Sequence, residues 1–105
     1  MARSMPDLPP PIAPDRLIHE PGRLAVLAVL HAVEEADFQF LLNQTSLTRG
    51  NLSSHTAKLE AAGYVDIEKT FVGKVPRTVY RLTDDGSEAL AAYREHMAGV
   101  LEAMT

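Results

Sequence analysis

The hydrophobic pattern of the chain changes its period at Gly63. Up to that residue, apolar side chains recur at steps of three and four, which is typical of helices with one buried face. Beyond it, two short segments have the composition and alternation of strands, and the helical period then returns. The pattern therefore predicts a mainly α fold that contains one β-hairpin, an α+β class.

The boundaries of these elements follow from residues that start and stop helices. Thr48 can cap a helix and Gly63 can end it. Asp37 can cap a second helix, and Thr83 or Asp84 can cap the last one. We expect helices over residues 21–33, 38–44 and 49–62, strands over 64–71 and 77–82 around a turn at 73–76, and a last helix over 84–104. A lone hairpin is marginal in water, so this one must pack against the helices.

The order of elements is that of a helix-turn-helix followed by a β-hairpin wing. A helix of about 14 residues is about 21 Å long. Its N-terminal end can enter a DNA major groove about 12 Å wide. A basic hairpin beside it can reach phosphates or the minor groove. The order of elements thus favours binding to double-stranded DNA.

The charge of the 105-residue chain is unevenly distributed. The whole chain carries −4, which by itself argues against a nucleic-acid partner. Residues 48–81, however, hold six Lys/Arg and three Asp/Glu, a net +3, so that the rest carries −7. The basic third of the sequence coincides with the expected helix-turn-helix and wing.

Several classes of function lack their signatures. The chain has no cysteine, which excludes disulfides and thiolate metal sites. Its four histidines form no metal spacing, and no nucleophile motif, dinucleotide fingerprint or phosphate-binding loop occurs. No apolar run approaches the roughly 20 residues of a membrane span. We expect a cytoplasmic protein that is not an enzyme, with no metal and no cofactor.

The chain divides into three expected parts. Residues 1–14 hold five of the seven prolines and are expected to form a flexible N-terminal arm, or else an arm that packs on a partner subunit. Residues 15–83 form the expected DNA-binding domain, which contains the helix-turn-helix and the wing. Residues 84–105 form a C-terminal helix with a continuous apolar stripe, which is typical of a dimerisation helix.

Several motifs resemble a known family. They are Leu47-Thr48-Arg49-Gly50-Asn51-Leu52-Ser53-Ser54-His55, Lys58-Leu59-Glu60, Gly63-Tyr64-Val65 and Phe71-Val72-Gly73-Lys74-Val75-Pro76-Arg77-Thr78. Together they resemble small winged-helix DNA-binding transcriptional regulators related to the MarR and ArsR groups, over about residues 15–95. The resemblance implies a dimeric repressor or activator that places helix 49–62 in the major groove and the 72–78 wing on the backbone or in the minor groove.

The resemblance also implies which residues of the recognition helix meet DNA. They are Thr48, Arg49, Asn51, Ser53, Ser54 and Lys58. Arg49 and Asn51 suit guanine and adenine edges, whereas Thr48, Ser54 and Lys58 suit the backbone and Ser53 suits either. Thr48 could instead be only a cap, and Arg49 and Lys58 could be ordinary solvated residues. Leu52 and Leu59 should be core, and we expect His55 to be partly buried and hydrogen-bonded rather than a ligand. Thr56 departs from the family, which has an apolar residue there.

The wing and the last helix supply the other candidates. The wing candidates are Lys69, Lys74, Arg77 and Thr78, with a merely solvated hairpin as the alternative. The dimer candidates are Leu90, Tyr93, Met97, Leu101 and Met104, with packing on their own domain as the alternative. We expect a homodimeric DNA-binding regulator, more readily a repressor. The alternative function is a winged-helix module for protein interaction, and a small-molecule effector would fit between the first and last helices.

Overall fold

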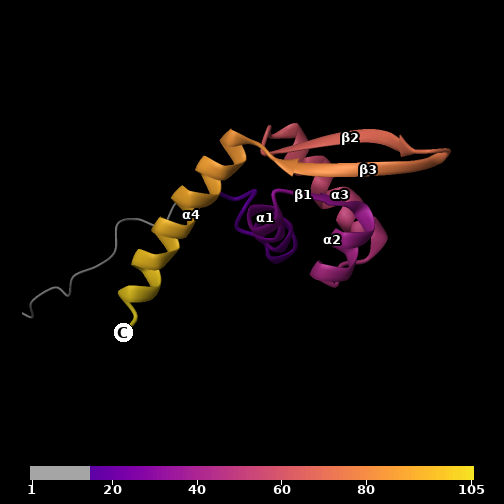
Figure 1. Ribbon diagram of the computed structural model, residues 1–105. Helices are drawn as coiled ribbons and strands as arrows, with labels where there is room; N and C mark the ends of the chain where they lie inside the picture. The colour runs from indigo at the N-terminus through magenta and orange to yellow at the C-terminus, as the bar shows by residue number, and fades with distance from the viewer. Residues whose placement is uncertain (1–14) are drawn as a thin grey trace, which may run out of the picture.

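The computed structural model describes residues 15–105, and the predicted arm at 1–14 lies outside this range. Within it the chain forms four helices and a three-stranded antiparallel sheet (Figure 1). The elements are α1 (Pro21–Val33), β1 (Glu35–Asp37), α2 (Phe38–Thr45), α3 (Arg49–Ala61), β2 (Val65–Val72), β3 (Val75–Leu82) and α4 (Asp84–Glu102). The predicted α+β class, its four helices and its hairpin are confirmed. None of these helices is long and apolar enough to span a membrane.

The helices α2, α3 and α4 begin after residues expected to cap them. The backbone N–H of Asn51 donates to Thr48 Oγ1 at 3.1 Å, and that of Gly86 donates to Thr83 Oγ1 at 2.9 Å. Asp37 caps α2 in the same way. The cap of α1 was not predicted: Glu20 accepts from the first-turn N–H groups with its carboxylate. These bonds satisfy donors that have no partner inside the helix.

The sheet contains a strand that the sequence pattern missed. The sequence pattern predicts no element between the helices at 21–33 and 38–44, but β1 pairs there antiparallel with β3, and the strand order is β1-β3-β2. Glu34 turns the chain with a φ of 69°, and Ala36 is then buried opposite Tyr80. A strand of three residues is too short to show a period, which is why the pattern could not reveal it.

The hairpin turn is tighter than predicted. Gly73 and Lys74 alone connect the strands, and Gly73 has a φ of 63°, as the first residue of a type II′ turn requires. The third strand therefore begins at Val75 instead of residue 77. Pro76 is tolerated in it because β1 pairs only with Val79–Arg81, so the strand has one neighbour at Pro76.

The core lies between α1, the helix-turn-helix and the base of the hairpin. Its fully buried aliphatic residues are Ile18, Val26, Leu27, Leu30, Leu41, Leu52, Leu59 and Val65. Leu52 and Leu59 are core, as predicted. Thr56 is buried beside them, and its hydroxyl donates back to the carbonyls of Leu52 (2.9 Å) and Ser53 (3.2 Å). That bonding lets a polar side chain occupy an apolar position.

The helix α4 divides at its middle. Leu90 and Tyr93 are buried in the chain's own core, and Met97 packs against it. Leu101, in the last turn of α4, and Met104, which lies beyond the helix, are exposed. The helix ends at Glu102, before the predicted end at residue 104. The single chain thus already covers the first part of the predicted dimer stripe and leaves its end bare. The assignment of this stripe to a dimer interface stays a prediction.

Candidate nucleic-acid interface

The helix α3 presents a polar side to solvent. Its buried positions Leu52, Thr56 and Leu59 are spaced four and three apart and face the core. Every predicted DNA-contacting residue of the helix is exposed, namely Thr48, Arg49, Asn51, Ser53, Ser54 and Lys58. The structure therefore brings them onto the accessible side of one element, and their contact with DNA remains a prediction.

The start of α3 is braced by α2. The guanidinium of Arg49 lies 5.7 Å from the ring centroid of Phe38, and its Nη2 donates to Gln39 Oε1 at 3.3 Å. Both partners belong to the first turn of α2. Since a guanidinium has five N–H donors, most of them stay available to an acceptor outside the chain. These two contacts orient Arg49 and leave most of its N–H groups unoccupied.

A cluster of charged groups locks α3 to α1. The Nδ1 atom of His55 lies 3.5 Å from Glu20 Oε2 and 3.3 Å from Arg23 Nη1. Burial raises the pKa of Glu20, but backbone N–H bonds from Gly22 and Arg23, with the charges of His55 and Arg23, outweigh it and lower the pKa overall. His55 is half-buried and partnered, as predicted, and its contacts with Glu20 and Arg23 hold α3 against the start of α1.

The predicted wing residues lie on different faces of the hairpin. Lys69 pairs with Thr78, two positions along from the pair Ile67 and Tyr80, and therefore lies on the same face of the hairpin. Nearer the base, the helices cover this face. Arg77 lies on the opposite face, with its Nε atom 3.8 Å from Asp37 Oδ2. Lys74 occupies the turn. Within residues 15–105, neither lysine has an ion-pair partner within 4 Å.

The wing also carries an exposed apolar tip that the sequence analysis did not single out. Phe71, Val72 and Val75 are 68%, 60% and 66% exposed. In the sequence Phe71 and Val72 read as ordinary strand residues and Val75 as part of the turn, because apolar character alone does not show whether a strand is covered or exposed. The signal was their position next to Gly73, at the hairpin turn and far from any helix along the chain.

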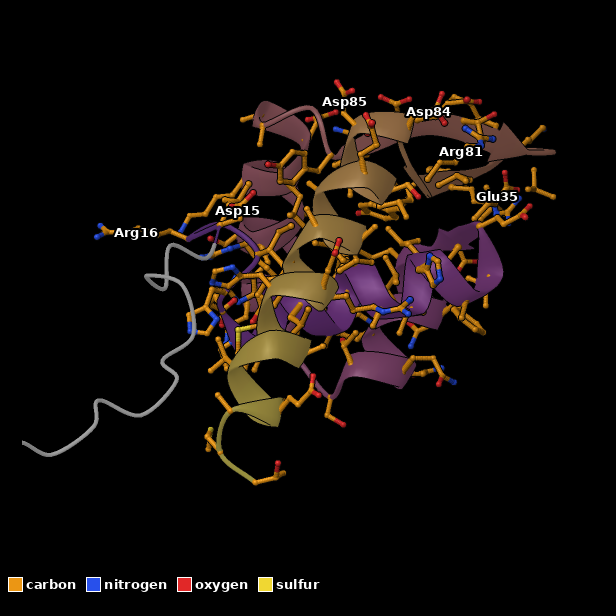
Figure 2. The ribbon with its side chains drawn as sticks, turned by 90° about the vertical axis from the view of Figure 1, so that its left-hand side faces the viewer. Asp15, Arg16, Glu35, Arg81, Asp84 and Asp85 are labelled. Atoms are coloured by element: carbon orange, nitrogen blue, oxygen red, sulfur yellow. The ribbon has the colours of Figure 1, made fainter. Side chains whose placement is uncertain are left out.

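The remaining cation of the hairpin is held by acids. Arg81 Nε donates to Glu35 Oε2 at 2.8 Å and its Nη1 donates to Glu68 Oε2 at 3.1 Å. Bonds to Glu68 and then Glu35 raise the pKa of the guanidinium. Figure 2 shows Arg81 beside Glu35, with Asp84 and Asp85 at the start of α4. This end of the sheet is acidic, in contrast to the wing.

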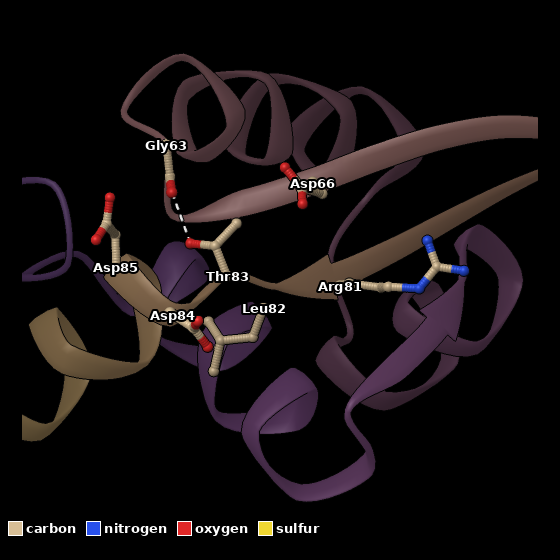
Figure 3. Close-up of a pocket in the computed structure, with 7 residues that line it drawn as sticks. All are labelled: Gly63, Asp66, Arg81, Leu82, Thr83, Asp84 and Asp85. Carbon is tan, nitrogen blue, oxygen red and sulfur yellow. Dashed lines mark hydrogen bonds between the residues drawn. The ribbon is translucent and has the colours of Figure 1, made fainter.

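A hollow of about 520 Å³ lies at that acidic end (Figure 3). The hydroxyl of Thr83 donates to the Gly63 carbonyl at 2.6 Å on its wall. Figure 3 shows the Arg81 guanidinium pointing away from Asp84 and Asp85. Within the described part of the chain, no three His, Asp or Glu side chains are grouped to hold a metal ion. A second hollow of about 480 Å³ separates α1 from the start of α4, where the sequence analysis placed any effector.

A helix-turn-helix with an exposed polar second helix and a projecting hairpin defines a winged-helix DNA-binding domain. Residues 23–101 match the family model described as winged helix DNA-binding domain, and the chain belongs to that family. The predicted resemblance is thereby confirmed. Members are DNA-binding domains of transcriptional regulators, typically without enzymatic activity.

Individual proteins and solved structures are also similar to this chain. The chain is 34% identical over 71 residues to the uncharacterized protein MJ0432 of Methanocaldococcus jannaschii, covering 68% of this chain and 77% of that one. The structure of a transcriptional regulator homologue from Pyrococcus horikoshii superposes with a TM-score of 0.80 at 30% identity, covering 85% and 88% of the two chains. A MarR-family regulator from Silicibacter pomeroyi shares the fold, with a TM-score of 0.66 at 22% identity, covering 85% of this chain and 59% of its own.

Proposed function

We propose that the protein is a homodimeric transcriptional regulator that represses by occupying its DNA site. The exposed polar side of α3 carries this proposal, because its accessible residues are those that suit base edges and phosphates. The N-terminus of α3 enters the major groove, where Arg49 and Asn51 meet base edges. The wing lies on the adjacent backbone or in the minor groove. A dimer that covers promoter DNA represses without further contacts.

The exposed end of α4 supports the dimer. Leu101 and Met104 are 57% and 74% exposed, and they continue the stripe that begins in the core. A second copy of α4 would bury both. A two-fold dimer matches a pseudo-palindromic site with half-sites about 10 bp apart or a multiple of that. Sedimentation at micromolar concentration tests this: Leu101→Glu with Met104→Glu should give a folded monomer, and a wild-type monomer would contradict the proposal.

DNA binding is tested by fluorescence anisotropy across a salt series. The probes are duplexes enriched from a random pool by the protein itself and a scrambled control. Preferential binding with a log–log salt slope of several units is expected. Lys74→Ala should lower the slope by roughly one unit. Arg16→Ala is the matched control, because Arg16 is exposed in the turn before α1, outside the helix-turn-helix and wing. Absence of binding to any duplex at low salt would favour the protein-interaction module instead.

A further inference from the structure

The tip of the wing is apolar on both faces of its ribbon. Phe71 lies directly opposite Pro76, and Val72 lies directly opposite Val75. Successive residues of a strand point to opposite faces, so the first pair lies on the helix side and the second on the outer side. Figure 1 shows this end of the hairpin projecting past the helices. The described chain leaves both faces to solvent.

The apolar tip does nothing for the fold that the structure shows. Phe71, Val72 and Val75 are each at least 60% exposed, whereas the same strands bury Val65 and Tyr80 at their base. An exposed apolar hairpin end is an aggregation hazard, and soluble proteins usually place polar residues there. Such a tip indicates a contact outside the chain.

The charges around the tip indicate what it contacts. Residues 69–78 contain three cations and no acid. Two of them, Lys69 and Lys74, lack an ion-pair partner within 4 Å among residues 15–105. We call Lys69, Lys74 and Arg77 the cationic collar of the apolar tip. Cations around an apolar tip suit a partner whose surface is anionic and whose interior is apolar. Duplex DNA has both properties, since its phosphates enclose stacked bases.

We propose that the wing tip is a wedge that enters the DNA minor groove end-on, with Phe71 partly unstacking a base step. The inference rests on the proposed function and adds a mode of reading to it. The minor groove is about 6 Å wide, too narrow for a two-stranded ribbon to lie in it. Apolar side chains that insert between base pairs kink the duplex and open this groove. Such a contact covers both faces of the tip, whereas a flat protein surface would cover one.

The wedge gives the protein selectivity without base hydrogen bonds from the wing. Pyrimidine–purine steps such as TA and CA kink most easily. The preferred site should therefore carry one of these steps in the minor groove beside each α3 contact. Lys69 and Lys74 bind the flanking phosphates, while Phe71 inserts at the pyrimidine–purine step.

The test uses the full chain and an enriched duplex with 2-aminopurine at the flexible step. Unstacking raises the fluorescence of this base, and wild-type protein should produce the rise. Phe71→Ser should abolish the rise and weaken binding about tenfold, a typical cost of losing one base–aromatic stack. Its salt slope should stay unchanged, because no phosphate contact is lost. Phe71→Leu, which keeps an apolar wedge, should retain most of the rise.

Two control variants distinguish the base contact of Phe71 from the phosphate contacts of the lysines and from the effect of shortening any exposed apolar side chain. Lys74→Ala should lower the salt slope and keep the fluorescence rise. Val33→Ala, which shortens an exposed apolar side chain at the end of α1, should change neither. DNA binding without a rise, or a Phe71→Ser variant that matches wild type, would overturn the wedge and leave the regulator standing. A variant that alters only sedimentation would assign the tip to a protein contact and overturn the wedge. Failure to bind any duplex would overturn both proposals.

Discussion

The base and the tip of the hairpin are built from the same two strands and have opposite surroundings. At the base, Val65 and Tyr80 are 1% and 5% exposed beneath the helices. At the tip, Val75 and Phe71 are 66% and 68% exposed. The residue types match in pairs, a valine with a valine and one aromatic ring with another. The covering helices, and not the strand sequence, decide which half stabilises the domain.

The difference predicts that the base of the hairpin serves stability and that its tip serves the proposed DNA binding. The base is held by apolar burial and by the acids around Arg81, while the tip has cations and bare apolar groups. A change at the base should therefore alter folding, and a change at the tip should alter binding. The following substitutions test that division, each with a matched partner.

The largest contrast is expected between the two aromatic rings. Tyr80→Ala removes a buried ring from the core and should lower the free energy of unfolding by about 4 kcal/mol. Phe71→Ala should change it by less than about 0.5 kcal/mol, because the ring is mostly in solvent already. Urea unfolding followed by circular dichroism measures both. A large loss from Phe71→Ala would show that the tip is part of the folded core and would erase the contrast.

Much of the fold is predictable because its signals are local. The bounds predicted for α1 coincide with those observed, and the caps Thr48 and Thr83 hold α3 and α4 as expected. The strand β1 was not predicted, because the residues with which it pairs lie some 45 positions away in sequence. Register across such a separation depends on how the helices pack, which no local pattern records.

The candidate site is only partly predictable for the same reason. Exposure of the α3 residues follows from helical period once Leu52 and Leu59 are placed in the core. The wing cations could not be sorted by sequence, because their faces depend on the register between β2 and β3. Arg77 lies near Asp37 only because β1 joins the sheet beside β3. The apolar tip needed the structure to show where the helices stop.

A difference in stability of intermediate size is expected between alanine substitutions at two glycines of α4. A Cβ at Gly86 would clash with the Tyr64 carbonyl oxygen, where the helix meets the base of the hairpin. Gly86→Ala should therefore destabilise the domain by about 2 kcal/mol. A Cβ at Gly99 meets nothing within 4 Å, so Gly99→Ala should leave stability unchanged or raise it by up to about 1 kcal/mol. Thermal unfolding compares them, and equal stability would refute the close contact at the base.

The smallest effect on stability is expected from the charged groups that hold the helices, and this effect depends on pH. The carboxylate of Glu20 accepts from Gly22 (2.9 Å) and Arg23 (2.8 Å), and its pKa in the folded chain is lowered. A lowered folded pKa means that the stabilisation is present above the unfolded value and is lost as pH falls through the folded one. Stability should therefore decline below about pH 4.3. Within residues 15–105, Lys69 and Lys74 of the wing have no ion-pair partner to lose.

Glu20→Gln isolates that contribution. It should cost about 1 kcal/mol at neutral pH, typical of a weakened helix cap, and the gap to wild type should narrow as the solution is acidified. Glu88→Gln is the matched control, since Glu88 is exposed on α4 and makes no side-chain hydrogen bond or ion pair within residues 15–105. Urea unfolding at pH 7 and pH 3 provides the comparison. A gap that stays constant between the two pH values would mean that the charge of Glu20 does not hold α1, and that the helical part and the wing respond to acid alike.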